Sequence, residues 1–328
     1  MPRDLISLAR TLHFALWALF LLTQQEAFSQ NPKAGEVIVQ PPIYSSFTFP
    51  TQAPVAKIMF AIAAPGSTGK TMAKRERVLA QGRVRLPINS DLFVDLCFDS
   101  LAHLDSLKQL YPCRVSSLSA ANLDFEDKDM HFLEGFKSLT GINMSDTLIS
   151  DKSLAQIAMF PKLNVIRLSK TNVTGTGFDQ LKRLHNLFDI SLEGINLKPG
   201  TIGELKPLLP NLIGFNVTRT GLTKEDATVL KELKVVRELR LATNRQIDNQ
   251  CVKYLSQLKE LESLSIADTS ITDKSIPMLI KIPKLKSVKV RDKDFWTSTK
   301  HQTKYGRLEF IDAERTSTIP ADFCITGK

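Results

Sequence analysis

The stretch INMSDTLISD at residues 142–151 decides the fold, because it recurs as LSIADTSITD at residues 264–273. Both copies belong to a longer pattern in which apolar residues occupy the first, fourth and sixth positions. The pattern starts eight times at steps of 24 or 25 residues, at Val115, Leu139, Leu163, Leu187, Leu212, Val236, Leu261 and Leu285. The fourth and sixth positions alternate with other residues, which predicts a short strand with one buried face.

The residues after each predicted strand continue the pattern. A threonine follows at Thr147, Thr171, Thr220 and Thr269, and we expect its hydroxyl to bond backbone groups in the turn. Apolar residues then recur at helical spacing. Asp151 and Asp273 stand where N-caps are expected, and Pro161 and Pro283 stand where the helices end. Each unit therefore predicts a strand, a turn, a helix and a return loop.

These units resemble leucine-rich repeats. The form L-x-x-L-x-L-x-x-T-x-I-T-D followed by a helix is similar to that of secreted bacterial leucine-rich-repeat proteins, over residues 115–290 and about eight units. The resemblance implies an α/β solenoid with parallel strands on the concave face and helices on the convex face, capped at both ends. We expect weaker rungs in the internal polar ladder at Leu123 and Ile195, which replace threonine, and near Asn244, where the repeat has an extra residue.

The first thirty residues predict export. Residues 1–29 begin with basic residues, continue with an apolar run at residues 12–22 and end in small residues before Gln30, as a secretory signal peptide does. A membrane anchor is the alternative, but the run is shorter than the roughly twenty residues that cross a bilayer. We expect no membrane span after cleavage, and a secreted, periplasmic or cell-envelope protein. The net charge of +9 permits contact with anionic surfaces.

The flanking regions predict a linker and two caps. Residues 30–54 are rich in proline and are interpreted as a linker. Residues 55–114 are expected to form an N-terminal cap region, with strands at 84–86 and 92–98 and a helix at 101–110. Residues 291–328 contain the last apolar residues and are expected to cover the final repeat as a C-terminal cap.

Few residues suggest chemistry. The segment APGSTGKT at residues 64–71 fits a relaxed phosphate-binding loop, but the sixty or so residues before the first repeat are too few for the domain that such loops need. Cys97 and Cys113 are compatible either with a disulfide or with two unpaired thiols, and this choice stays open. The histidines stand beside no nucleophile or metal-ligand motif. We therefore expect no catalytic residue, no cofactor and no metal site.

The alternation along the strands predicts a polar binding surface. Its candidate residues are Asn143, Arg167, Asp189, Glu193, Asn216, Glu238, Arg240, Lys289 and Arg291. Tyrosine and tryptophan, which anchor many interfaces, are missing from these positions. The sequence favours a secreted, non-catalytic protein that binds protein or glycan at the cell envelope, with no nucleic acid expected. The alternatives are a nucleotide-binding protein using residues 64–71 or an unrecognised hydrolase, and a structural component of the envelope.

Overall fold

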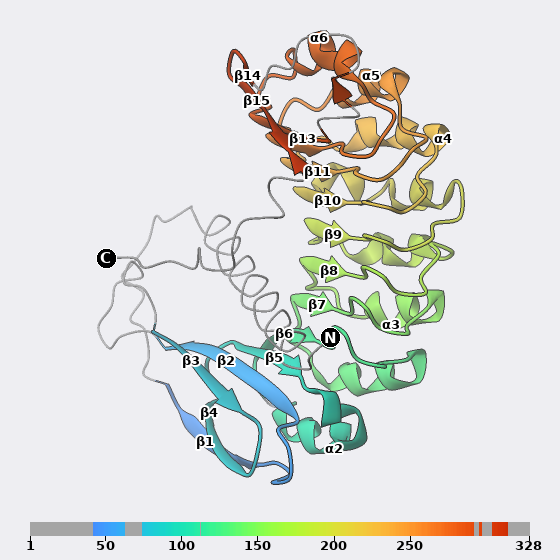
Figure 1. The fold of residues 1–328 in the computed structure, drawn as a ribbon. Coiled ribbons are helices and arrows are strands. Elements are labelled where there is room, and N and C mark those ends of the chain that lie inside the picture. Colours follow the sequence, from blue (N-terminus) through green and yellow to red (C-terminus); the bar gives the residue numbers. More distant parts are fainter. Residues whose placement is uncertain (1–41, 63–73, 112, 292–294, 297–303, 314–328) are drawn as a thin grey trace. The chain divides into compact units, whose positions relative to one another are not determined.

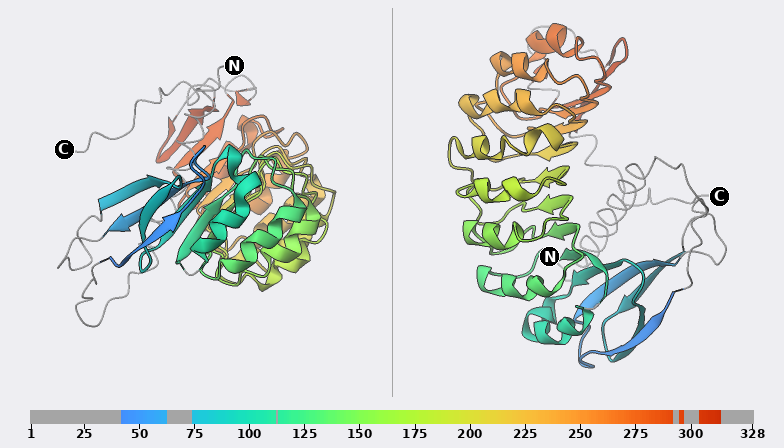
Figure 2. Two further views of the ribbon diagram at one scale, coloured as in Figure 1. Left: turned by 90° about the horizontal axis from the view of Figure 1, so that it is seen from below. Right: turned by 180° about the vertical axis from the view of Figure 1, so that it is seen from behind.

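The computed structural model describes residues 42–62, 74–111, 113–291, 295–296 and 304–313. The chain divides into two compact units, Met1–Arg167 and Leu168–Lys328, and each is described by itself (Figures 1 and 2). The predicted signal peptide and the segment resembling a phosphate-binding loop lie outside the described residues. Within those residues the structure has no helix long and apolar enough to cross a bilayer.

The first unit begins with a two-stranded antiparallel sheet and with three strands that extend the sheet of the repeats. The strands are β1 (Tyr44–Thr48), β2 (Ala56–Ile62), β3 (Lys74–Leu79), β4 (Arg83–Pro87) and β5 (Leu92–Leu96). Strand β1 pairs with β4, β2 lies between β3 and β5, and β5 pairs in parallel with the first repeat strand, β6 (Val115–Ser119). The interval interpreted as a linker therefore contains a strand. Phe47 and Phe49 are buried, and these two aromatic residues give a proline-rich segment an apolar anchor.

A short helical stretch connects this region to the repeats. It consists of η1 (Phe98–His103), α2 (Leu104–Leu107) and η2 (Lys108–Leu110), close to the helix expected at residues 101–110. Cys97 and Cys113, on either side of it, are free thiols in the structure. Burial raises the pKa of each thiol to about 11.

Every predicted repeat strand is present. The first unit contains β6 (Val115–Ser119), β7 (Gly141–Asn143) and β8 (Val165–Arg167), and the second contains β9 (Asp189–Ser191), β10 (Gly214–Asn216), β11 (Glu238–Arg240), β12 (Ser263–Ser265) and β13 (Ser287–Val290). Neighbouring strands are parallel and keep the repeat register, as Leu239, Leu264 and Val288 show. These three side chains are fully buried. The structure confirms the leucine-rich-repeat solenoid fold.

The helical side of the repeats is built from short segments. These are η3 (Asp127–Gly135), η4 (Asp151–Ser153) and α3 (Leu154–Ile157) in the first unit, and η5 (Phe178–Arg183), η6 (Thr201–Leu205), η7 (Leu209–Asn211), α4 (Lys224–Ala227), η8 (Thr228–Glu232), η9 (Asn249–Cys251), α5 (Val252–Leu255), η10 (Asp273–Ser275) and α6 (Ile276–Leu279) in the second. Most are 3₁₀ turns, which cover about 2.0 Å per residue and so cross the unit with fewer residues than an α-helix needs.

The predicted N-caps are displaced by one residue. Ser150 and Thr272 hold the extended backbone of the N-cap, while Asp151 and Asp273 are the first helical residues. A carboxylate in the first turn still interacts favourably with the helix dipole. The preceding repeat also contributes, because Asp127 accepts hydrogen bonds from Ser150 N at 2.8 Å and from Ser153 Oγ at 2.5 Å.

The turns after the strands contain the expected polar ladder. Thr147, Thr171, Thr220 and Thr269 each donate from the hydroxyl to the carbonyl oxygen three residues earlier, at 2.7–2.9 Å. The residue before this position has a positive φ in seven repeats, including Gly194 and the β-branched Thr243. Such a left-handed residue turns the chain sharply away from the sheet.

The expectation of a weak rung at Asn244 is wrong. Asn244 occupies the threonine position itself, and the extra residue follows it. Its carboxamide oxygen accepts from the N–H groups of Thr220 and Leu222, and its amide nitrogen donates to the carbonyls of Val217 and Leu241. A carboxamide both accepts and donates, so this rung has more hydrogen bonds than a hydroxyl can provide.

The described part of the C-terminal segment extends the sheet of the second unit. Strand β15 (Leu308–Asp312) pairs in parallel with β13, and β14 (Lys304–Tyr305) pairs with β15. Leu308 and Phe310 are buried. Arg307 donates to the carbonyl of Ile282 after α6, which also accepts from Leu285 N–H at 3.4 Å. Residues 314–328 lie outside the described residues.

Candidate functional site

The strand side of the second unit contains most of the predicted surface residues. Its short strands run from β9 to β15, with the helical segments on the other side of the sheet (Figure 1). The middle residue of each repeat strand points into the core, as buried Ile190 and Leu264 do. The residues on either side of the middle residue therefore form two rows across the opposite face of the sheet.

The strand register defines the two rows. The acidic row consists of Asp189, Gly214, Glu238, Ser263, Ser287 and Glu309. The basic row consists of Ser191, Asn216, Arg240, Ser265, Lys289 and Ile311. Two residues along a strand separate the rows, which corresponds to about 6.6 Å. Adjacent strands are about 4.8 Å apart, so side chains within a row are close neighbours.

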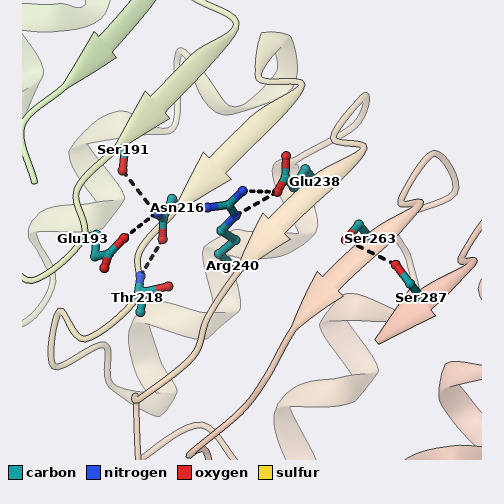
Figure 3. Close-up of polar contacts among 8 residues, drawn as sticks. All are labelled: Ser191, Glu193, Asn216, Thr218, Glu238, Arg240, Ser263 and Ser287. Carbon is teal, nitrogen blue, oxygen red and sulfur yellow. Dashed lines mark hydrogen bonds and ion pairs between the residues drawn. The ribbon is translucent and has the colours of Figure 1, made fainter. Parts of the chain in front are cut away.

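The β9–β10 end of this face is a hydrogen-bonded network (Figure 3). Asn216 Nδ2 donates to Ser191 Oγ at 3.2 Å and to Glu193 Oε2 at 3.1 Å. Asn216 Oδ1 accepts from the backbone N–H of Thr218 at 3.0 Å. Ser191 also bonds Ser169 Oγ at 2.9 Å. The network holds these side chains against the sheet and leaves Glu193 as its half-buried anionic edge.

Asp189 lies over a glycine on the next strand. A Cβ atom added to Gly214 would stand 2.2 Å from Asp189 Oδ2, so the carboxylate occupies the place of a side chain on β10. Asp189 itself is 7% exposed. A side chain at position 214 would therefore displace the carboxylate of Asp189, which fills the space above the glycine backbone.

The middle of the face is a charged pair beside small side chains. Arg240 donates from Nε to Glu238 Oε1 at 2.7 Å, which joins the two rows on β11 (Figure 3). The following strands present Ser263, Ser265 and Ser287, all half-buried. Ser287 Oγ donates to Ser263 Oγ at 3.4 Å (Figure 3). These hydroxyl-bearing positions form a shallow platform next to the Arg240 guanidinium.

The far side of the platform is basic. Lys289 follows Ser265 in the basic row and is exposed. Arg291 lies beyond the end of β13 and is held by Asp268, with Nη2 to Oδ2 at 2.7 Å and Nε to Oδ1 at 2.6 Å. Lys289 therefore presents an exposed ammonium, whereas the guanidinium of Arg291 is paired with a carboxylate.

A ladder of ion pairs runs beside the platform at the start of the strands. Lys284 contacts Glu260 at 2.6 Å, and Lys286 contacts Glu262. The hydrogen bond from Lys286 lowers the pKa of Glu262, so this carboxylate is ionised at neutral pH. These pairs join equivalent positions of neighbouring repeats, and their exposed placement makes each one worth little stability.

The remaining predicted residues belong to the first unit. Asn143 ends β7, is 8% exposed, and accepts from the backbone N–H of Ser145 at 3.1 Å. Arg167 ends β8 and is half-buried. Asn143 has the same local bond as Asn216, which is also 8% exposed. Both asparagines therefore shape the turns after their strands, while Arg240 and Lys289 are the exposed cations of the predicted set.

Two features of the face escaped the sequence reasoning. The closeness of Asp189 to Gly214 depends on side-chain placement, and no sequence pattern reports it. Glu309 and Ile311 join the rows because β15 pairs with β13, and the alternation of LEFID at residues 308–312 was the available signal. Among the described residues, no three His, Cys, Asp or Glu side chains gather as a metal site.

Comparison with known proteins gives structural matches only. No family model matches the chain, and no curated protein gives a significant match. Internalin C2 of Listeria monocytogenes is a similar solved structure, with 20% identity and a TM-score of 0.44 over 66% of this chain and 79% of that one. An internalin F of the same species has 16% identity and a TM-score of 0.46, over 68% of this chain and 66% of that one.

Proposed function

We propose that this chain is a secreted, non-catalytic binding protein that contacts protein or glycan at the cell envelope through the strand face of residues 168–328. The observation that carries the proposal is the pair of rows of opposite charge. Glu238 and Glu309 lie in one row and Arg240 and Lys289 in the other, with serines between them. A surface of this kind complements a partner that presents anionic groups to the basic row and cationic or polar groups to the acidic row.

The shape of the face supports an extended polar contact. Ser263, Ser265 and Ser287 are too small to obstruct an approaching chain, and their hydroxyls both donate and accept hydrogen bonds. Arg240 and Lys289 project from either side of Ser265 in the same row. A partner carboxylate or other anion over Ser265 would therefore lie between the exposed ammonium of Lys289 and the Arg240 guanidinium, which is already paired with Glu238. Such contacts weaken with added salt, because exposed charges are screened.

The non-catalytic part of the proposal rests on how the polar groups are used. The side chain of Asn216 is hydrogen-bonded to Ser191, Glu193 and Thr218, so its polar groups stabilise the strand face. The secreted part rests on the sequence of residues 1–29, with its basic start, apolar run and small residues before Gln30.

The test is capture of a partner from the envelope fraction of the source cell. Three forms of the protein serve as bait: wild type, Arg240→Glu/Lys289→Glu, and Lys231→Glu/Lys281→Glu. The last variant has the same change in charge, but Lys231 lies in η8 and Lys281 follows α6, on the helical side. We expect wild type and the helical-side variant to capture the same partner and the strand-face variant to lose it. Equal capture by all three would contradict the proposal.

A further inference from the structure

Strand β3 is the edge strand of the sheet that contains the repeat strands of the first unit. The sheet order there is β3, β2, β5 (Figure 1), and β2 is the only strand that pairs with β3 among the residues described. The second long edge of β3 therefore has no described strand beside it. An edge of this kind presents backbone N–H and C=O groups that another chain can pair with.

The hydrogen-bond pattern identifies which residues of β3 face that edge. Ala80 N–H donates to Ala56 O at 2.8 Å, and Cys97 N–H donates to Val55 O at 3.0 Å on the other side of β2. In an antiparallel ladder the hydrogen-bonded positions alternate. Even-numbered residues of β3 therefore point their backbone groups toward β2. Arg75 and Arg77 point theirs toward the outer edge, as does Leu79, whose carbonyl accepts from Gln81 N–H in the turn after β3.

The same residues share one face of the sheet. Arg75 pairs in register with Ala61, Arg77 with Met59, and Leu79 with Lys57. Both arginines are exposed, and Leu79 is 46% exposed. Phe60 and Glu76 are paired on the opposite face, where Phe60 is buried. The outer strand thus presents cation, cation and apolar side chain at alternate positions.

Within the part of the chain that the structure describes, no carboxylate forms an ion pair with Arg75 or Arg77. The side-chain contact of Arg77 is with Met59 Sδ at 4.0 Å, which positions the guanidinium without a charge partner. Elsewhere in the described residues, cations are commonly paired: Lys224 contacts Asp248 at 2.5 Å and Lys284 contacts Glu260 at 2.6 Å. Arg75 and Arg77 are therefore available to an acidic ligand.

We propose that the outer edge of β3 binds an extended acidic peptide segment of another protein by strand addition. The backbone groups of Arg75 and Arg77 and the N–H of Leu79 pair with the incoming strand, while the Leu79 carbonyl accepts from Gln81 N–H at 2.9 Å. Residues of that strand opposite Arg75 and Arg77 are two apart and on the same face, with Cβ atoms about 5 Å from the arginine Cβ atoms. The incoming peptide is therefore expected to have two acidic residues separated by one residue of any type, and an apolar residue opposite Leu79.

The charge pattern selects against a second copy of this chain. If β3 paired with β3 of another molecule in an antiparallel arrangement, arginines would stand opposite or diagonal to arginines. Like charges across neighbouring strands are destabilising. The arginines therefore oppose self-association and favour an acidic strand. The same two residues attract an acidic peptide and repel a second copy of β3. This edge and the strand face of the second unit are separate surfaces, so either proposal can fail without the other.

The binding test uses the full chain and a fluorescein-labelled peptide in which glutamate alternates with threonine. Fluorescence anisotropy should show saturable binding that Arg75→Glu/Arg77→Glu weakens about tenfold or more, since two attractive pairs become repulsive. The same variant should bind a labelled peptide of alternating lysine and threonine. The control Arg83→Glu/Arg85→Glu makes the same charge change on β4, in the other sheet, and should retain glutamate-peptide binding.

A second comparison tests the backbone pairing. Arg77→Pro removes one outward N–H, whereas Arg77→Ala keeps it, and proline is tolerated on an edge strand whose N–H faces solvent. Thermal melting verifies that both variants fold. The proline variant should bind the glutamate peptide more weakly than the alanine variant.

Equal binding by those two variants, or equal losses in the β3 and β4 charge variants, would overturn strand addition in favour of general attraction to a basic surface. Absence of saturable binding would also overturn the proposal and leave the arginines as a guard against edge-to-edge association. A wild-type dimer in light scattering that excludes the peptide would assign the edge to a second copy.

Discussion

Replacing Asn244 by leucine removes the most highly bonded rung of the second unit. The side chain of Asn244 is 1% exposed. Its Oδ1 accepts from the N–H groups of Thr220 at 3.2 Å and Leu222 at 3.0 Å. Its Nδ2 donates to the carbonyls of Val217 and Leu241, both at 2.8 Å. Leucine has similar size, so the substitution deletes hydrogen bonds with little change in volume.

The expected loss is about 4–5 kcal/mol. Each of the four bonds contributes about 1 kcal/mol net, and a buried N–H left without an acceptor raises the cost toward the upper end. Asn244→Thr is the matched control, because threonine occupies this position in four other repeats. Its hydroxyl can donate to the Leu241 carbonyl, as Thr220 does to Val217. We expect that variant to lose only about 2–3 kcal/mol.

Urea unfolding followed by circular dichroism measures both variants, with the midpoint and slope fitted separately. An unchanged slope with a lower midpoint would show that the folded state is weakened and that cooperativity persists. If Asn244→Leu costs less than about 1 kcal/mol, or if leucine and threonine cost the same, the polar-ladder argument is refuted.

Three further predictions concern single positions. Leu264→Ala should lower the unfolding free energy by about 2–5 kcal/mol, because the side chain is fully buried. Ser265→Ala, on the outer face, should lower it by less than about 0.5 kcal/mol. Equal losses in the two variants would mean that the strand register is wrong. Thr243→Asn should raise the melting temperature and stabilise the folded protein by about 0.5–1 kcal/mol, because asparagine tolerates the φ of +58° better than a β-branched residue does. A lower melting temperature would contradict this expectation. Burial would raise the pKa of Asp127, but hydrogen bonds from Ser150 and Ser153 lower this pKa overall. The contribution of Asp127 to the unfolding free energy is therefore present above about pH 4 and is lost as the pH falls further. Unfolding titrations should show a shallower acid dependence of stability for Asp127→Asn, and an unchanged profile would contradict the assignment.

The repeat strands were predictable because the signal is both local and repeated. A single short strand such as β12 has only three residues and a weak pattern of its own. Eight copies in register make the prediction strong, because each apolar position must pack against the equivalent position of the neighbouring repeat. The turn hydroxyls, including that of Thr269, followed from the same register.

Other features were beyond sequence reasoning for definable reasons. The burial of Asp189 against Gly214 is a contact between repeats, so the identity of either residue alone does not reveal it. The rung at Asn244 was misjudged because a count of inserted residues does not show which residue keeps the ladder position. Strand β1 was obscured because Pro41, Pro42 and Pro50 dominate the composition around it.

The most direct test of the central claim is site-specific photo-cross-linking in the envelope fraction. A photoreactive amino acid replaces Ser265 on the strand face in one form and Lys253, an exposed residue of α5, in another. Both positions tolerate a larger side chain, because neither is buried. A binding surface on the strand face predicts a discrete covalent adduct from position 265 and none from position 253. An adduct from position 253 alone, or no adduct from either position, would contradict a binding function of the strand face.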